Sequence, residues 1–213
     1  MEKIISFGHL NIDAADELYI GGKRQKAEIF SIGDSQNSDT DIRWQIQNGK
    51  LIQKDPVVQA YWYSIVQSNF HSGILVDVDG FEFSAHIPCI QTSDIADCRT
   101  VDFGPWNFWI QDQRQITSPY FIGEETNWEP KYDPPVDRHG IWIRLIMEPI
   151  VPASLSALIG QEIKLFLPTG VSEPLILKEI SDYDLVCSGK DMKELVFERA
   201  SVCLLYTSDA ADE

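Results

Sequence analysis

One loop holds the residue types that general acid–base chemistry uses. The stretch Asp133-Pro-Pro-Val-Asp137-Arg-His139 places two carboxylates and an imidazole close together, and catalytic groups often sit on loops carried by a rigid scaffold. Residues 133–139 are therefore one candidate for a hydrolase site. The sequence contains no G-x-S-x-G nucleophile motif, no phosphate-binding P-loop and no G-x-G-x-x-G. We favour binding over catalysis and predict no catalytic residues.

Metal-ligand residue types are also present, namely His71, His86, Cys89 and Cys98. Zinc sites usually pair their ligands at short spacings such as C-x-x-C, and this chain has no such pair. His86 and Cys89 would point to opposite faces of a regular strand. We interpret these residues as buried cysteines and partly exposed histidines. Neither a metal ion nor another cofactor is predicted.

The segment from residue 105 to 140 is rich in tryptophan, proline and acidic residues, and it shows little periodicity. Short strands are expected over 107–111 and 120–122, joined by long loops. Exposed aromatic side chains among acids suit an interface with a basic protein, because aromatics supply contact area and carboxylates steer the encounter. The candidate interface residues are Trp106, Trp109, Trp128 and Tyr132. The alternative, left open, is that these side chains fasten a long loop to the core.

The overall charge also favours a basic partner. The 213 residues include 17 Lys and Arg against 33 Asp and Glu, a formal net charge of −16, and a field of that sign repels nucleic acid and anionic membranes. No apolar run approaches the length of a membrane span, and the first residues lack a signal-peptide layout. The three cysteines before residue 203 form no even disulfide framework. We therefore expect a reducing, cytoplasmic location and no membrane contact.

The pattern predicts that residues 1–151 form a β-rich domain built on an antiparallel sheet. Asn48-Gly49 and Asp79-Gly80 each join two alternating apolar segments. Such dipeptides supply the two positive φ angles of a type I′ turn, so both predict β-hairpins. A strong strand is expected over residues 141–147.

One main helix is expected at about residues 56–69. Asp55 is a good N-cap, and Pro56 suits the first helical position. The apolar residues that follow have helical spacing; they are Val58, Tyr61, Trp62, Ile65 and Val66. We expect this stripe to face the core. Around Thr92 to Asp94, at most one further helical turn is expected.

Residues 152–202 show a short apolar helical turn followed by closely spaced strands, the pattern of a small, strongly bent barrel. The helical turn covers residues 155–160. The expected strands cover 162–167, 175–180, 185–187, 194–197 and a fifth beginning at 200. The fold class is therefore α+β and β-rich, with an antiparallel sheet, one main helix and a C-terminal barrel of Sm or SH3 type.

Three stretches of this segment carry a further signal. They read Leu155-x-x-Leu158-Ile159-Gly160-x-x-Ile163-x-Leu165-x-Leu167-x-x-Gly170, Ser181-Asp182-Tyr183-Asp184-Leu185-Val186, and Val196-Phe197-Glu198-Arg199-Ala200-Ser201-Val202. The segment thereby resembles the Sm-like fold, including the bacterial Sm-like RNA chaperone. The resemblance implies RNA binding, with Tyr183 stacking on a base and Arg199 helping to hold it.

The segment also departs from that pattern. Asp184 stands where the family usually has Asn, and Pro174 and Leu175 occupy the place of a usual glycine. Residues 152–202 carry five Lys and Arg against eight Asp and Glu, which opposes phosphate binding. We favour a barrel used for packing or protein contact, with RNA binding as the alternative.

The last eleven residues, 203–213, read Cys-Leu-Leu-Tyr-Thr-Ser-Asp-Ala-Ala-Asp-Glu. This run is similar to the translation of an adapter used in sequencing-library preparation. We therefore expect residues 203–213 to be non-native and Val202 to be the last native residue present. The chain as a whole is expected to be an assembled metagenomic fragment. Removing the three acidic residues of this run from a net charge of −16 leaves −13. The first four residues of the run are still apolar enough to complete the fifth strand.

These observations predict a non-catalytic intracellular binding protein. A small acidic inhibitor or immunity-type protein that neutralises a basic partner fits the charge and the lack of catalytic motifs. RNA binding through Tyr183 and Arg199 is the first alternative. Hydrolysis by the loop 133–139 is the second.

Overall fold

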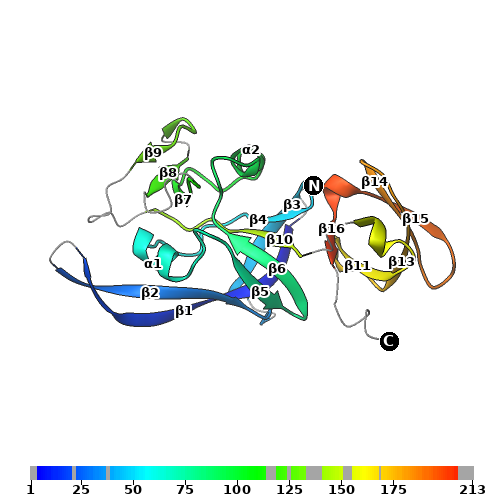
Figure 1. Ribbon diagram of the computed structural model, residues 1–213, viewed down its shortest axis with the longest axis horizontal. Coiled ribbons are helices and arrows are strands. Elements are labelled where there is room, and N and C mark those ends of the chain that lie inside the picture. The colour runs from blue at the N-terminus through cyan, green and yellow to red at the C-terminus, as the bar shows by residue number, and fades with distance from the viewer. Residues whose placement is uncertain are drawn as a thin grey trace.

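The protein has a β-rich α+β fold, seen in a computed structural model (Figure 1). The structure describes residues 4–20, 23–36, 39–113, 119–123, 126–132, 141–150, 155–167 and 169–205. Within these ranges the chain forms three sheets, all of whose strand pairs are antiparallel, and two short α-helices. No helix in the described part of the chain is long and apolar enough to cross a membrane.

A seven-stranded sheet forms most of the N-terminal part, in the order β2-β1-β3-β4-β10-β6-β5. Its strands are β1 (Ile4–Ile20), β2 (Lys23–Gly33), β3 (Asp41–Gln47), β4 (Lys50–Gln53), β5 (Ile74–Val78), β6 (Phe81–His86) and β10 (Ile146–Pro149). The two predicted hairpins are confirmed as β3–β4 and β5–β6. Asn48 and Gly49 have φ angles of 52° and 76°, which is the backbone a type I′ turn needs.

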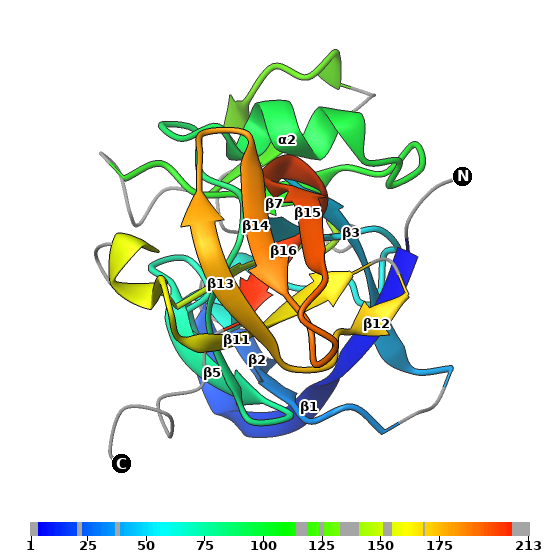
Figure 2. The same cartoon turned by 90° about the vertical axis from the view of Figure 1, so that its right-hand side faces the viewer.

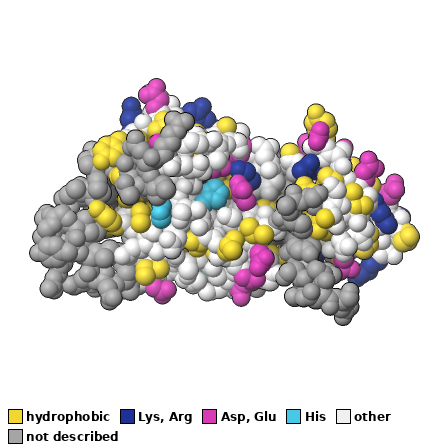
Figure 3. Space-filling model, viewed as in Figure 1, with side chains coloured by type: hydrophobic (Ala, Val, Ile, Leu, Met, Phe, Trp, Pro, Cys, Tyr) yellow, Lys and Arg dark blue, Asp and Glu magenta, His cyan; other side chains and the backbone are white. Residues whose placement is uncertain are grey.

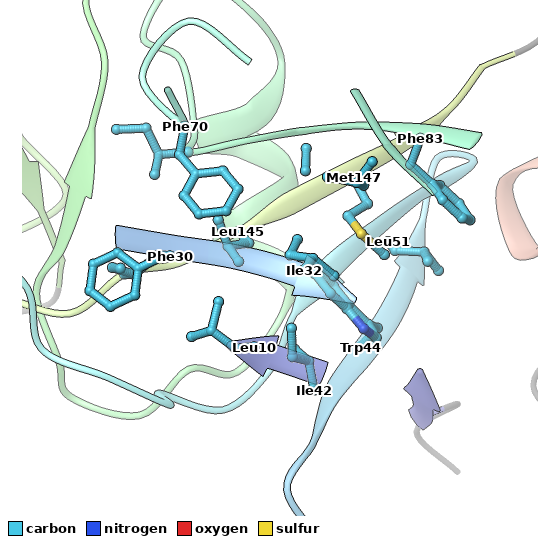
Figure 4. Packing of buried hydrophobic residues seen from close by; sticks show 14 of the residues in the cluster. Leu10, Phe30, Ile32, Ile42, Trp44, Leu51, Phe70, Phe83, Leu145 and Met147 are labelled. Atoms are coloured by element: carbon cyan, nitrogen blue, oxygen red, sulfur yellow. The ribbon is translucent and has the colours of Figure 1, made fainter. Parts of the chain in front are cut away.

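The main core lies against this sheet and forms because alternate strand residues point to the same face. In β3, Ile42, Trp44 and Ile46 are buried while Arg43 is exposed. Figure 4 shows side chains from several strands meeting around Trp44 and Leu51. The buried Trp44 Nε1 donates a 2.7 Å hydrogen bond to the carbonyl of Phe7, so the indole is both packed and satisfied.

The predicted main helix is present but shorter, as α1 (Trp62–Gln67). Residues 58–60 instead lie beside the segment that begins at residue 141. The amide of Ala60 donates to Ile141 O at 3.1 Å, and the amide of Ile143 donates to Val58 O at 3.0 Å. These strand-like bonds replace the first helical turns, because tertiary pairing outweighs local helix signals. The predicted strand 141–147 is regular only from Ile146 onward.

A second helix, α2 (Asp94–Thr100), extends over two turns where at most one was expected. It packs with a three-stranded sheet made of β7 (Phe108–Ile110), β8 (Tyr120–Ile122) and β9 (Lys131–Tyr132). Cys98 and Val101 share a buried cluster with Phe108 and Ile122. The tryptophan-rich segment is therefore backed by a second buried cluster, which it shares with Ile52 and Ile146 of the large sheet.

The C-terminal strands form a nearly closed, barrel-like sheet (Figure 2). Its elements are the 3₁₀ turn η2 (Leu155–Leu158), β11 (Glu162–Leu167), β12 (Gly170–Val171), β13 (Leu175–Ile180), β14 (Asp184–Ser188), β15 (Glu194–Glu198), the 3₁₀ turn η3 (Arg199–Ser201) and β16 (Cys203–Leu205). The last strand begins at Cys203 rather than at residue 200 and pairs with β11. Apolar residues from these strands fill the barrel with a separate core.

The barrel is joined to the large sheet by direct packing. Phe166 of β11 lies in the core of the large sheet, and its ring centroid is 4.6 Å from that of Phe7. Cys203 Sγ donates to the carbonyl of Gly49 at 3.2 Å. The turn between β3 and β4 therefore lies at the boundary between the sheet and the barrel.

We expect Trp44→Phe to lower the free energy of unfolding by about 1–3 kcal/mol, because it leaves the buried carbonyl of Phe7 without its donor. Urea denaturation followed by circular dichroism measures the change. The control is Leu75→Ala, since Leu75 is 79% exposed and its truncation should cost less than about 0.5 kcal/mol. Equal costs for the two variants would contradict the role given to the indole hydrogen bond.

Candidate functional site

A cluster of charged side chains lies where the large sheet, α2 and the barrel approach one another. Its centre is Lys50, the first residue of β4. Lys50 Nζ is 2.8 Å from Asp94 Oδ1, 2.7 Å from Glu148 Oε1 and 3.9 Å from Asp97 Oδ2. Asp94 and Asp97 come from α2 and Glu148 from β10. One ammonium group therefore connects two strands and a helix.

The two aspartates are buried and fully engaged. Asp94 Oδ2 accepts from the amide of Cys89 at 3.0 Å, and Asp97 Oδ2 accepts from Ser93 Oγ at 2.9 Å. Asp97 Oδ1 accepts from Asn48 Nδ2 at 2.7 Å. Because buried carboxylates need both hydrogen bonds and a countercharge, these contacts explain why α2 lies over the β3–β4 turn.

His86, on β6, lies at the inner side of the cluster. Its Nδ1 is 2.9 Å from the carbonyl of Ile87, so this nitrogen carries a proton in the neutral ring. The other nitrogen, Nε2, lies 3.7 Å from Glu148 Oε1. Burial favours the neutral ring and lowers the pKa of His86, but Glu148, the Ile87 carbonyl and Asp94 together raise that pKa above its ordinary value.

The surroundings favour the charged forms of Lys50 and Glu148. Burial would lower the pKa of Lys50, but hydrogen bonds and attraction from Asp94 and Glu148 outweigh it and raise that pKa. His86 and Lys50 lower the pKa of Glu148 to about 2, against a smaller opposing effect of burial. A lysine held as ammonium is neither a base nor a nucleophile. Lys50 and Glu148 are therefore suited to fixing charge rather than transferring protons.

A cleft of about 450 Å³ opens beside this cluster, between the large sheet and the barrel. Its walls are formed by Asn48, Gly49, Lys50, Glu148 and Pro149 on the sheet side, and by Leu155, Asp182, Leu185, Arg199, Ala200, Val202 and Leu204 on the barrel side. Figure 3 shows histidine, basic and acidic side chains gathered near the middle of the face it displays. Clefts at junctions of this kind are common ligand sites.

No family model, no curated protein and no solved structure matches this chain.

The four aromatic residues predicted to form an interface differ in how far they are exposed. Trp106 is 45% exposed and Tyr132 is 55% exposed, while Trp128 is half-buried with the Arg99 guanidinium 5.5 Å from its ring. Trp106 packs against Trp142 with ring centroids 5.6 Å apart.

Trp109 does not belong to this surface, which corrects the prediction. It is only 3% exposed, and its Nε1 donates to the carbonyl of Ala60 at 2.7 Å. Its ring centroid is 5.6 Å from that of Trp62 in α1. Trp109 alternates with Phe108 and Ile110 in a strand buried on both faces, so it fastens the segment to the core.

The two residues of the RNA alternative lie together. Tyr183 is 79% exposed, and its carbonyl accepts a 2.8 Å hydrogen bond from the amide of Arg199. The Arg199 side chain donates from Nη1 to Ser181 O at 2.8 Å and lines the cleft. Asp184 and Glu198 stand opposite each other in β14 and β15 beside this pair. The surroundings are therefore acidic, which disfavours phosphate.

The other sequence candidates do not form a site in the described part of the chain. The loop 133–139 lies outside the described residues. Among the residues that are described, no group of three or more His, Cys, Asp or Glu is placed to hold a metal ion. Cys98 is buried, and burial raises the pKa of its thiol to about 12. Cys89 is also buried, and its Sγ donates to Gln91 Oε1 at 3.3 Å.

Sequence reasoning missed the Lys50 cluster. The only local signal is the spacing of Asp94 and Asp97, which share one face of a helix when they lie three residues apart. Lys50 is 44 residues from Asp94 and Glu148 is still further along the chain. No sequence pattern joins them, because the sheet order brings them together.

We expect Lys50→Met to lower the free energy of unfolding by about 3–5 kcal/mol, because it leaves the buried Asp94 and Asp97 without a countercharge. Denaturant unfolding measures the loss. The matched control is Lys190→Met, which breaks an ion pair with Glu173 whose side chains are 81% and 82% exposed. That control should change stability by less than about 0.5 kcal/mol, and a similar small effect at Lys50 would refute the assignment.

Glu148→Gln should change the response to acid. The folded-state pKa of Glu148 is about 2 and its ordinary value is 4.5. Because the pKa is depressed, the ionised carboxylate stabilises the fold above pH 4.5, and this contribution is lost as the pH falls towards 2. The stability difference between wild type and Glu148→Gln should therefore be full above pH 4.5 and shrink below it.

Unfolding curves recorded through this pH range measure that difference. Wild type and Glu148→Gln differ by only one unit of net charge. Comparing them therefore removes the general effect of net charge on stability. The exposed Glu173→Gln variant is the control and should alter stability little throughout. A wild-type-minus-variant difference that does not shrink in acid would contradict the role assigned to Glu148.

Proposed function

We propose that the protein is a non-catalytic binding protein for a basic protein partner. The observation that carries this proposal is the pair of large exposed aromatics, Trp106 and Tyr132, on and beside the three-stranded sheet of a chain with net charge −16. Tryptophan and tyrosine are enriched among the residues that dominate the binding energy of protein interfaces. The negative field attracts a basic partner and raises its association rate.

The aromatic surface is supported from beneath, which suits it to recognition. Tyr132 makes an edge-to-face contact with Tyr120, with ring centroids 5.7 Å apart. Trp128 makes a similar contact with the buried Phe108 at 6.0 Å. Because these neighbours already restrict the aromatic rings, little side-chain entropy remains to be lost on binding. Arginine and lysine side chains of a partner can also stack on such rings.

RNA binding at Tyr183 and Arg199 is the alternative. The exposed Tyr183 side chain and Arg199, which are joined by a backbone hydrogen bond, favour it, since bases stack on tyrosine rings and on guanidinium groups. Asp182, Asp184 and Glu198 oppose it by repelling phosphate. A basic protein partner accounts for both the aromatics and the charge, so we prefer it.

Binding of a fluorescent ten-residue peptide of alternating arginine and glycine tests the proposal. We expect saturable binding at low salt that weakens as salt is added. Trp106→Ala and Tyr132→Ala should each weaken it roughly 5- to 30-fold, the loss typical of interface aromatics. Leu75→Ala, which truncates an exposed side chain on β5, should leave it unchanged.

Labelled single-stranded oligouridine serves as the competing probe in the same salt series. Peptide binding that both aromatic variants leave unaltered would contradict the proposed surface. Tight oligouridine binding that is lost in Tyr183→Ala would establish the RNA alternative in its place.

A further inference from the structure

We propose that the cleft between the large sheet and the barrel binds the side chain of a lysine or arginine. The cationic head group lies against the carboxylates of Glu148 and Asp182, and the aliphatic stem lies against Leu185 and Val202. The natural source of that side chain, a basic protein partner, rests on the proposed function. The affinity of the cleft for a cationic side chain does not, and it can be measured separately.

The cations already in the cleft are engaged by the protein itself. The Lys50 ammonium lies 2.8 Å from Asp94, 2.7 Å from Glu148 and 3.9 Å from Asp97, so its positive charge is already countered by carboxylates. The Arg199 guanidinium is held in place by the hydrogen bond that its Nη1 donates to the carbonyl of Ser181. The Lys50 ammonium is therefore not a free receptor for an anionic ligand, while the Arg199 guanidinium is held by a neutral carbonyl and keeps further donors.

Carboxylate oxygens, by contrast, remain available. Glu148 uses Oε1 for its contacts with Lys50 and His86, and its side chain is 41% exposed. Its Oε2 has no hydrogen-bond or ion-pair partner among the described residues, and the same holds for both oxygens of the exposed Asp182. These two residues come from opposite walls of the cleft. A cation placed between them gains two charge-assisted contacts.

The formal charges in and behind the cleft also favour a cation. Lys50 and Arg199 contribute two positive charges. The four carboxylates are Asp94, Asp97, Glu148 and Asp182, which leaves a net charge of −2 with His86 neutral. Protonation of His86, which sits over Glu148, makes the sum −1. The field therefore attracts cations in either state and repels phosphate or a free carboxylate.

The shape and lining select a long side chain over a bare ion. The cleft holds about 450 Å³, within the range of small-molecule sites. Pro149, Leu155, Leu185 and Val202 give it apolar surface next to the carboxylates. Lysine and arginine combine an aliphatic stem with a charged head and bury the stem against such surface. A metal ion would gain nothing from the apolar wall, and no ligand trio is present among the described residues.

Titration of the full chain with amino acid derivatives, followed by amide chemical shifts in NMR, tests the cleft. The probes are the Nα-acetyl N-methylamides of lysine, arginine, norleucine and glutamate. We expect saturable binding of the first two, with shifts centred on Asn48, Gly49 and Asp182. Norleucine has the same stem without the charge and should bind at least about tenfold more weakly, as a lost charge-assisted contact implies. Glutamate should not bind.

Asp182→Asn removes one carboxylate from an exposed turn without touching the Lys50 cluster. It should weaken lysine binding roughly 3- to 10-fold, and Glu148→Gln should weaken it further. Glu179→Gln is the matched control, because it removes one charge from an exposed position of β13 outside the cleft. Equal binding of lysine and norleucine overturns the proposal. So does equal weakening by Asp182→Asn and Glu179→Gln, which would reflect net charge alone.

The two proposals fail in different ways. If the lysine derivative binds the cleft but Trp106→Ala leaves binding of the arginine–glycine peptide unaffected, the proposed aromatic surface is contradicted and the cleft assignment is supported. If the peptide depends on Trp106 and Tyr132 while the lysine derivative shows no saturable shifts, the cleft assignment is wrong and the proposed function stands.

Discussion

The junction between the large sheet, α2 and the barrel depends on the burial of two carboxylates against one lysine. Asp94 and Asp97 lie almost wholly out of water, where an uncompensated charge costs several kcal/mol. Lys50 removes that cost only if α2 lies over the start of β4. The same ammonium also draws in Glu148 from β10. The side chains that form the sheet wall of the cleft are therefore held by electrostatics already required for folding.

The opposite wall is held by apolar packing. Phe166 inserts from the barrel into the core of the large sheet, where it meets Phe7. The barrel retains its own core around Leu165 and Leu177, so it is a distinct layer anchored by a shared aromatic contact. A cleft with both walls anchored in this way is formed before a ligand arrives, which reduces the entropy lost on binding.

Local patterns predicted much of the fold and little of the site. The hairpins at Asn48-Gly49 and Asp79-Gly80 and the strands of the barrel follow from turn chemistry and alternation, which are properties of neighbouring residues. The helix expected from residue 56 begins only at Trp62, because residues 58–60 bond instead to the segment around Ile141 and Ile143. The Lys50 cluster combines three distant parts of the chain, and only the order of the strands in the sheet brings them together.

The turn at Asn48 and Gly49 also has a consequence for the chemical lifetime of the protein. An asparagine followed by glycine is the dipeptide most prone to spontaneous deamidation, and asparagine is among the thermolabile residues. Here the side-chain amide of Asn48 donates to Asp97 at 2.7 Å. Deamidation would replace that donor with a carboxylate facing Asp97 and add one more negative charge around Lys50. Slow ageing of a single amide would thus loosen α2 from the sheet and reshape the mouth of the cleft without any change in the encoded sequence.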